Sequence, residues 1–282
     1  MSAIWTLRSI RCPLCPARWS ALEIKNEVCR KFGFTVNIGI STNKLLAKDV
    51  DVVFAASAEA VEKLGAPDKT LVVGNPVRPE ILTQDRNAAR AKIGAGDRTV
   101  ILSFGGSLGA RRINEVVGAL CGWEQKTHQK VLHLHATGSR GVQLFKDLAV
   151  QEGFTPGENL VVNEYINNMP ELLAAADLVI SRSGALTLAE LEAMGRASIL
   201  IPSPNVAENH QYYNALELQK AGAAIVIEEK DLTAEKLIET VSGLLETPGR
   251  LAEMGRQALT LAQPRSLDMI TDRLLTLVKT GR

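Results

Sequence analysis

Between about Thr70 and Glu228 the sequence alternates short apolar runs with longer segments that have the period of an α-helix. The runs are TLVVG, TVILSF, KVLHLHA, NLVVN, DLVIS, ASILIP and AAIVIE. Runs that are apolar and β-branched almost throughout are typical of strands buried on both faces of a parallel sheet. Their alternation with helical segments predicts a doubly wound α/β domain.

The segments between the runs have the pattern of helices that cover such a sheet. In LTAEKLIETVSGLL, the side chains of Leu237, Val241, Leu244 and Leu245 fall on one stripe of a helix, and Thr233 stands where an N-cap is expected. This segment therefore predicts an amphipathic helix packed on the sheet.

Upstream of the repeating pattern the sequence predicts only part of a second α/β unit. Residues 41–74 give a helix, the strand VDVVFA, a helix and another strand, and NPVRPE, with its two prolines, has the character of a linker. Residues 1–36 show neither helical nor strand periodicity. We expect an atypical segment at 1–36, the remnant of one domain at 37–75, and a second domain with C-terminal helices at 76–282.

Charge and cysteine content narrow the classes of function. The 282 residues include 32 Lys and Arg against 31 Asp and Glu, a balance that does not favour a nucleic-acid partner. Cys12, Cys15, Cys29 and Cys121 are too few for a disulfide framework, and the Cys12–Cys15 pair lacks a histidine to complete a zinc knuckle. No run approaches 18 apolar residues, so we expect a protein of the cytosol.

The loop SFGGSLGARRINEVV follows the run TVILSF and leads into a helix that is expected to start near Ala110. Ligands of open α/β sheets bind beyond the carboxyl ends of the strands. The glycines let the backbone approach a ligand, and the free N–H groups at the helix start bind phosphate oxygens. A glycine-rich turn without any ligand remains the alternative interpretation.

The loop SRSGALTLAELEAMG follows the run DLVIS and has the same arrangement. Ser183 and Gly184 precede a second helix start, where Thr187 can cap the helix and offer a hydroxyl to a phosphate. Glu190 stands one turn inside that helix, and a carboxylate can accept two hydrogen bonds from a ribose diol. The alternative is that Glu190 only complements the helix dipole.

The four histidines do not predict a metal centre. His133 and His135 share one strand face, but no cysteine or acid stands near them at ligand spacing in the sequence. His128 lies in a polar loop and is expected to be solvated. His210 either contacts a ligand or caps the helix QYYNALELQ.

Five segments, in this order, resemble the MurG family of bacterial glycosyltransferases. They are GNPVR, FGGSLGARRIN, HATG, NEYINNMPELLAAADLVISRSGALTLAELEAMGRASILIP and ENHQYYNALELQKAGAA. The resemblance runs from about Thr42 to the C-terminus and is densest from Gly74 onward. It implies a GT-B fold with a complete Rossmann-like C-terminal domain, which holds the sugar nucleotide, and a truncated Rossmann-like remnant before it.

The resemblance also implies a set of donor-binding residues. The backbone of the YIN segment would read the uracil edge at Ile166, and Glu190 would bind the ribose hydroxyls. Gln211 and Asn214 match positions that hold the hydroxyls of N-acetylglucosamine. The matched positions at and around the diphosphate are Arg78, Gly106, Ser107, Ala185, Leu186 and Thr187, and His210 is a further donor-binding candidate.

The sequence departs from the family at several places. Leu108 and His210 stand where the family often has glutamine. The glycine-rich loop GGTGGH and the His, Glu and Gln of an HEQN segment have no counterparts, although Asn37 matches the last residue of HEQN. The resemblance therefore assigns no catalytic base, and most of an acceptor domain is expected to be missing or replaced by residues 1–36.

The activity implied by the resemblance is an inverting transfer of N-acetylglucosamine from its UDP derivative to undecaprenyl-linked muramyl-pentapeptide, which converts lipid I into lipid II. This step belongs to peptidoglycan synthesis and thus to cell shape and division. The resemblance implies no cofactor and no metal, and it implies peripheral attachment to the cytoplasmic face of the membrane. A non-catalytic UDP-sugar-binding fragment, a degenerate paralogue and a UDP-N-acetylglucosamine 2-epimerase are the alternatives.

Overall fold

The computed structural model describes residues 4–6, 39–41, 50–206 and 209–279. The chain divides into two compact units, and each unit is formed by more than one segment of the sequence. The first unit consists of Met1–Leu82, Ala185–Ala193 and Ala262–Arg282, and the second consists of Thr83–Gly184 and Met194–Leu261. The domain boundaries expected from the sequence, after residues 36 and 75, stay predictions.

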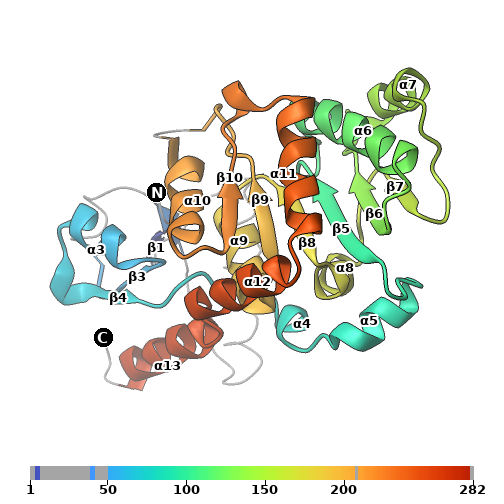
Figure 1. Ribbon diagram of the computed structural model, residues 1–282. Helices are drawn as coiled ribbons and strands as arrows, with labels where there is room; N and C mark the ends of the chain where they lie inside the picture. Colours follow the sequence, from blue (N-terminus) through green and yellow to red (C-terminus); the bar gives the residue numbers. More distant parts are fainter. Residues whose placement is uncertain (1–3, 7–38, 42–49, 207–208, 280–282) are drawn as a thin grey trace. The chain divides into compact units, whose positions relative to one another are not determined.

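The second unit is built on a six-stranded sheet in which every pair of neighbours is parallel. Its strands, shown as arrows in Figure 1, are β5 (Thr99–Phe104), β6 (Val131–Ala136), β7 (Leu160–Asn163), β8 (Leu178–Ser181), β9 (Ala197–Leu200) and β10 (Ala224–Val226). Each strand lies within one of the predicted apolar runs, so the predicted parallel α/β domain is confirmed.

The direction in which the chain adds strands to this sheet reverses once, between two neighbouring strands. The order is β10-β9-β8-β5-β6-β7, so the chain first proceeds from β5 outward to β7 and then returns to lay β8 on the other side of β5. The reversal therefore lies between β5 and β8. Their register pairs Phe104 with Ser181, so both strands end at the same level.

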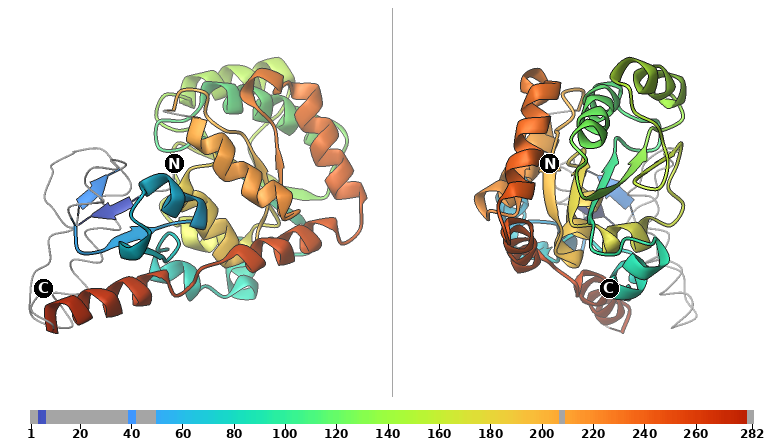
Figure 2. Two further views of the ribbon diagram at one scale, coloured as in Figure 1. Left: turned by 90° about the vertical axis from the view of Figure 1, so that its left-hand side faces the viewer. Right: turned by 45° about the vertical axis from the view of Figure 1, so that its right-hand side comes forward.

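Helices cover this sheet on both faces. They are α5 (Arg86–Lys92), α6 (Arg111–Lys126), α7 (Val142–Glu152), α8 (Met169–Ala175), α10 (His210–Lys220), α11 (Ala234–Glu246) and α12 (Arg250–Leu261). Helix α6 packs against both α7 and α11, and the two views of Figure 2 show α6 and α7, in green, side by side. Thr233 caps α11 by accepting a hydrogen bond from the Lys236 amide at 3.1 Å, as the sequence predicts.

The main core of the second unit lies between the sheet and α6. It joins Ile101 and Ile180 of the strands to Ile113 and Val117 of α6, and all four side chains are fully buried. Helix α5 packs against α8 instead, through a smaller cluster around Ala89. Alternate residues of the strands thus serve two apolar layers, which explains why the runs are apolar almost throughout.

A cluster of charges ties α5 to the amino ends of two central strands. Asp177, which directly precedes β8, accepts hydrogen bonds from Arg86 and Arg90, the second at 2.8 Å. Its carboxylate also accepts from the amide of Val100 in β5 at 2.8 Å. This carboxylate therefore holds α5, β5 and β8 together at the end of the sheet where the parallel strands begin.

The first unit contains a smaller, mixed sheet. Its strands are β1 (Ile4–Thr6), β2 (Gly39–Ser41), β3 (Val53–Ala55) and β4 (Thr70–Val72), in the order β2-β1-β3-β4. The predicted strand-helix-strand unit is confirmed, since β3 and β4 are parallel and α3 (Ala58–Leu64) connects them. β1 is antiparallel to both β2 and β3, an addition that the sequence analysis did not assign.

The described residues of the first unit also form four further helical segments. They are η1 (Pro67–Lys69), α4 (Pro79–Leu82), α9 (Ala185–Met194, all but its last residue) and α13 (Ser266–Lys279). Gly74 has φ +78°, and a Cβ there would lie 2.5 Å from Cβ of Gln263, so only glycine fits beside the start of the C-terminal segment. The chain from Asn75 to Arg78 is irregular, whereas Pro79 and Glu80, which the sequence analysis also assigned to a linker, begin α4.

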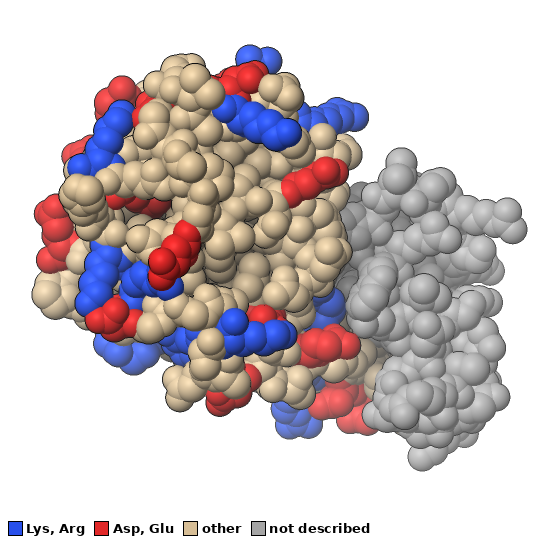
Figure 3. Space-filling model, turned by 90° about the vertical axis from the view of Figure 1, so that its right-hand side faces the viewer, with Lys and Arg blue, Asp and Glu red and all other residues tan. Residues whose placement is uncertain are grey.

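Several predicted features lie outside the described residues. These are the Cys12–Cys15 pair with Cys29, the predicted helix after Ser41, and Asn37. Within the described part of the chain, none of the helices combines the length and the apolar character needed to cross a bilayer. On the face in Figure 3, Lys and Arg side chains are interspersed with Asp and Glu, so its described residues create no field of a single sign.

Candidate functional site

Two loops of the second unit start side by side at the reversal of the sheet. Phe104 and Ser181 are paired in register, and the chain leaves them through Gly105 to Ala110 on one side and Arg182 to Gly184 on the other. In open α/β sheets the crevice outside the carboxyl ends of the strands at such a reversal is where ligands bind. Both loops that the sequence singled out are therefore in the position where a ligand site is expected.

The loop after β5 is held open by close backbone contact with the loop after β6. Gly109 has φ +81°, and a Cβ on it would lie 2.1 Å from the carbonyl oxygen of Thr137. The amides of Ser139 and Arg140 donate hydrogen bonds to the carbonyls of Ser107 and Leu108 at 3.3 and 3.2 Å. These contacts fix the loop and leave the side chain of Ser107 exposed.

Helix α6 starts directly after this loop, at Arg111, as the sequence predicts. Ala110 occupies the N-cap position and has no side chain that could accept a hydrogen bond from the first turn. The amides of the first turn of a helix have no partner inside the helix, and the helix dipole adds positive potential there. The start of α6 can therefore bind an anion with its backbone alone.

The loop after β8 is fixed by two polar side chains. Ser183 is fully buried, and its Oγ donates a hydrogen bond to the carbonyl of Gln211 at 2.8 Å. Gln211 in turn accepts a hydrogen bond from the Ser203 amide at 3.0 Å on its side-chain oxygen, which leaves its NH2 group for a ligand. Asn214, one turn further along α10, has a buried Nδ2 with no partner among the described residues.

Arg182 has a structural role in this loop. Its guanidinium donates to the carbonyls of Ile201 and Pro202, both at 3.1 Å, and pairs with Glu229. All of these groups belong to the second unit. The arginine therefore anchors the loop after β8 to the end of β9 and is not free to bind a ligand.

In the first unit, Arg78 and Glu190 form an ion pair. Arg78 Nε lies 2.8 Å from Glu190 Oε1, and the glutamate side chain is 14% exposed. Burial raises the pKa of Glu190, and the guanidinium of Arg78 counteracts part of that increase. Two of the residues to which the resemblance assigns donor contacts are thus direct neighbours, and the arginine favours the charged form of the carboxylate against the effect of burial.

Three predictions about individual residues can be judged directly. Helix α9 begins at Ala185, so Thr187 is its third residue and the prediction that Thr187 caps the helix was wrong. His210 is the first residue of α10 and Asn209, with φ +50°, occupies the cap position, so His210 does not cap it. His128 is exposed, as predicted.

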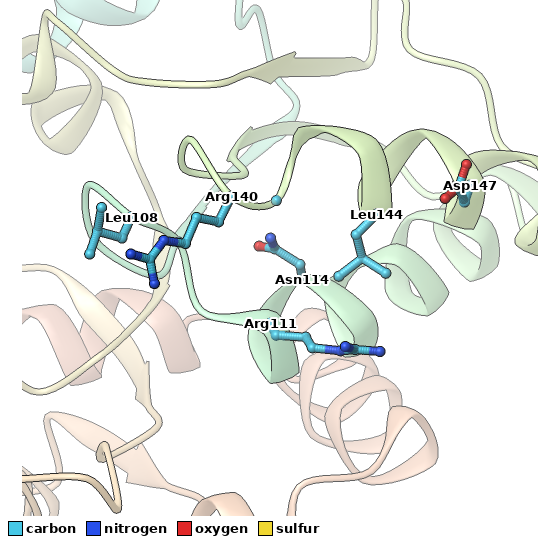
Figure 4. A pocket seen from close by; sticks show the side chains of 8 residues that line it. Leu108, Arg111, Asn114, Arg140, Leu144 and Asp147 are labelled. Carbon is cyan, nitrogen blue, oxygen red and sulfur yellow. The ribbon is translucent and has the colours of Figure 1, made fainter.

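A cavity of about 510 Å³ lies between the starts of α6 and α7. Figure 4 shows Arg140 extending toward Leu108 at one side, while Asn114 lies between Arg140 and Arg111. Asn114 is fully buried, and its Nδ2 donates to the carbonyl of Thr137 at 2.9 Å, whereas its Oδ1 has no partner among the described residues. The sequence analysis singled out none of these side chains except Leu108.

Sequence reasoning also missed a polar cluster inside the second unit. His133 Nδ1 lies 2.9 Å from Glu124 Oε2 and 3.8 Å from Cys121 Sγ, and all three side chains are buried. His133 Nε2 and His135 Nδ1 share the hydroxyl of Ser103, at 2.8 and 2.7 Å. The predicted common face of the two histidines is therefore confirmed. The signal that sequence reasoning overlooked is the spacing of Cys121 and Glu124, three residues apart on the buried side of α6.

Comparison with known proteins identifies a matching family and a set of similar proteins. Residues 100–270 match the glycosyltransferase family 28 C-terminal domain. A protein of Desulforudis audaxviator, named UDP-N-acetylglucosamine--N-acetylmuramyl-(pentapeptide) pyrophosphoryl-undecaprenol N-acetylglucosamine transferase, is 41% identical over 248 residues, which are 85% of this chain and 65% of that protein. Relatives of the same name are covered over 60 to 65% of their length, so the chain spans less than two thirds of these relatives.

Solved structures agree on the architecture. MurG of Acinetobacter baumannii superposes with a TM-score of 0.61 at 26% identity, over 78% of this chain and 64% of that one. A UDP-GlcNAc 2-epimerase of Neisseria meningitidis superposes with a TM-score of 0.57 at 16% identity, over 83% of this chain and 63% of that one. The second likeness shows a shared fold and nothing about the reaction.

Proposed function

The chain belongs to glycosyltransferase family 28, whose C-terminal domain matches more than half of its length, and from this premise we propose that it is a UDP-N-acetylglucosamine-dependent hexosyltransferase. The acceptor is undecaprenyl-linked muramyl-pentapeptide, so the reaction converts lipid I into lipid II with inversion at the anomeric carbon. The name of the relative that is 41% identical supports this choice of substrates.

The observation that carries the proposal is the position of the two loops at the reversal of the sheet. The loop after β5 ends in a helix start without a side-chain cap, and a diphosphate matches the hydrogen-bond donors that such a start offers. Phe104 and Ser181 end their strands at the same level, so the loop after β8 begins beside it. Residues 76–282 are thus proposed as the donor-binding domain.

The uridine contacts that we propose are made by one backbone segment and one acid. Ile166 has a buried side chain, which leaves its backbone as the part that can read the edge of uracil. Glu190 accepts hydrogen bonds from the ribose hydroxyls, because an ionised carboxylate is an acceptor only. The pairing with Arg78 supports this role, since the guanidinium favours the charged form of the carboxylate and opposes the effect of burial.

The diphosphate contacts that we propose stabilise the leaving group. Breaking the bond to the anomeric carbon leaves negative charge on UDP, and fixed donors aimed at that charge lower the barrier. In the second unit the donors are the hydroxyl of Ser107, the backbone at Gly106 and the start of α6. In the first unit they are Arg78 and the start of α9, namely Ala185, Leu186 and Thr187.

The sugar contacts that we propose come from α10. The free NH2 group of Gln211 and the unpartnered Nδ2 of Asn214 are donors for the hydroxyls of N-acetylglucosamine. His210, the first residue of the same helix, is a third contact. The acceptor is a bilayer lipid, and we infer peripheral attachment to the cytoplasmic face of the membrane, because a soluble enzyme must dock there to reach it.

The test is calorimetric titration of the purified chain with UDP-N-acetylglucosamine, followed by a turnover assay with a lipid I analogue. We expect saturable binding that Glu190→Ala weakens and that Glu239→Ala, a change of an exposed acid on α11, does not alter. Binding with turnover supports the full proposal, and binding without turnover supports a UDP-sugar-binding chain only. Absence of binding by the folded chain contradicts both.

A further inference from the structure

The buried cluster around His133 brings three atoms that can donate electron pairs together around one ring nitrogen. Both carboxylate oxygens of Glu124 lie within hydrogen-bond distance of His133 Nδ1, at 3.0 and 2.9 Å, and Cys121 Sγ lies 3.8 Å from the same nitrogen. A neutral imidazole carries one N–H, so it can satisfy only one of these acceptors well. A cation between the three atoms would accept an electron pair from each of them at once.

The chemistry of the three atoms matches one class of cation. Thiolate, imidazole and carboxylate together are the ligands of zinc, with bonds of about 2.0 to 2.3 Å in a tetrahedral arrangement. Such bonds place neighbouring ligand atoms on the order of 3.3 to 3.6 Å apart. The three donor atoms of Cys121, Glu124 and His133 all lie within 4.8 Å of one another, so shifts of roughly 1 Å or less in each side chain bring them to that geometry.

The second ring nitrogen of His133 is hydrogen-bonded, as is usual for a histidine that binds a metal. Its other ring nitrogen, Nε2, lies 2.8 Å from Ser103 Oγ, and that hydroxyl lies 2.7 Å from His135 Nδ1. Coordination through Nδ1 requires the tautomer with the proton on Nε2, which then donates to Ser103, while the Ser103 hydroxyl donates to His135. A hydrogen-bonded second nitrogen of this kind fixes the tautomer and the orientation of a ligating histidine.

An ion can reach the cluster from a neighbouring cavity. Glu124 lines a cavity of about 270 Å³, whose wall also includes His128, Gln129 and Asn159. Glu124 is thus both a member of the cluster and part of the cavity wall. The cavity also leaves room for water as a fourth ligand, the arrangement found where protein ligands number three.

We propose that Cys121, Glu124 and His133 form a zinc site in the second unit. The bound ion joins α6 to β6 through three protein ligands, with water as the fourth. On binding, a bond forms between the ion and each of the three donors, and the thiol proton of Cys121 passes to bulk water. Without a cation the site stays protonated, because burial and the nearby Glu124 raise the pKa of the Cys121 thiol.

The experiment uses the full chain with Cys12, Cys15 and Cys29 replaced by serine, so that Cys121 is its one remaining thiol. Cobalt(II) is the spectroscopic probe. We expect about one ion per chain, with a thiolate-to-cobalt charge-transfer band and the visible bands of a tetrahedral site, all displaced by zinc. Adding Cys121→Ser should remove the charge-transfer band, and zinc should raise the thermal midpoint of the parent variant only.

Two further variants make the result decisive. Glu124→Gln keeps the shape of the side chain and should weaken zinc affinity by about tenfold to 100-fold. His128→Asn changes the wall of the cavity without touching the three ligands and should leave affinity unchanged. A folded parent variant that binds no cobalt overturns the proposal. So does a charge-transfer band that survives Cys121→Ser, or zinc binding that depends on His128 and is insensitive to Glu124→Gln.

Discussion

Arg78 Nε lies 2.8 Å from Glu190 Oε1, although 112 residues separate the two in the sequence. The carboxylate is largely buried, and burial alone favours its protonated form. The guanidinium favours the charged form, so the arginine opposes the effect of burial on this carboxylate. If Glu190 binds the ribose of a nucleotide, as we propose, its affinity for that diol depends on Arg78.

Removing the charge of Glu190 should weaken donor binding. Glu190→Gln keeps the size of the side chain but loses the charged acceptor, and hydrogen bonds to charged groups contribute about 1.5 to 3 kcal/mol. We expect the Kd for UDP-N-acetylglucosamine to rise about tenfold to 100-fold. Calorimetry measures it, and Glu239→Gln on the exposed side of α11 is the matched control. Equal Kd values for the two variants would refute the ribose role.

Donor binding should weaken as the pH falls. The pKa of Glu190 is raised above 4.5 by burial, so its carboxylate takes up a proton at a higher pH than an ordinary glutamate. Both phosphates of a UDP-sugar are diesters and do not titrate in this range. Affinity should therefore be constant at neutral pH and fall by about a factor of ten per pH unit below the pKa of Glu190. Glu190→Gln should show a flat profile, and a fall of the same size in that variant would place the titrating group elsewhere.

Removing Arg78 should shift this profile to higher pH. The arginine lowers the pKa of Glu190 through a hydrogen bond and through its charge, so Arg78→Met leaves the burial effect unopposed. We expect the pH at which affinity begins to fall to move upward, in addition to any loss of affinity at neutral pH. Arg256→Met removes an exposed arginine of α12 in the second unit and serves as the control. An unchanged midpoint in Arg78→Met would show that the ion pair does not set the charge of Glu190.

The sequence predicted the elements of the second unit closely, because each strand is an apolar run bounded by glycine, proline or a polar cap. It could not predict the strand order, since parallel pairing depends on contacts far apart in the chain. The same limit explains the missed Cys121–His133 cluster. The two residues are 12 positions apart on different elements, and only the packing of α6 on the sheet brings their side chains together. The antiparallel pairing of β1 was missed because three residues carry no detectable period.

Gly109 should be intolerant of a side chain. Its φ of +81° disfavours any other residue, and a Cβ would lie 2.1 Å from the Thr137 carbonyl, so Gly109→Ala forces the two loops apart. We expect a loss of about 3 kcal/mol in the free energy of unfolding and weaker donor binding at temperatures where the chain stays folded. Gly94 has φ +64° but no atom within 4 Å of the added Cβ, so Gly94→Ala should cost only about 1 kcal/mol. Similar losses for the two variants in urea unfolding would mean that the loops move apart freely.

Asp177 should matter for stability and not for ligand affinity. Its carboxylate accepts from Arg86, Arg90 and the Val100 amide at the edge where the strands begin, and the proposed loops lie at the other edge. Asp177→Ala leaves the Val100 amide without its acceptor and removes the carboxylate from Arg86 and Arg90, which keep backbone carbonyls as partners. The acid is 22% exposed, so water compensates in part, and we expect a loss of about 2 kcal/mol.

The control for Asp177 is Asp97→Ala. Asp97 pairs with Lys130 on the surface, and both side chains are more than two thirds exposed, so the free energy of unfolding should not change measurably. Urea unfolding and calorimetric titration of the same samples separate the two effects. A folded Asp177→Ala protein should bind UDP-N-acetylglucosamine with the wild-type Kd, because its charge cluster touches neither loop. A changed Kd in that protein would mean that changes at the amino ends of the strands affect ligand binding at their carboxyl ends.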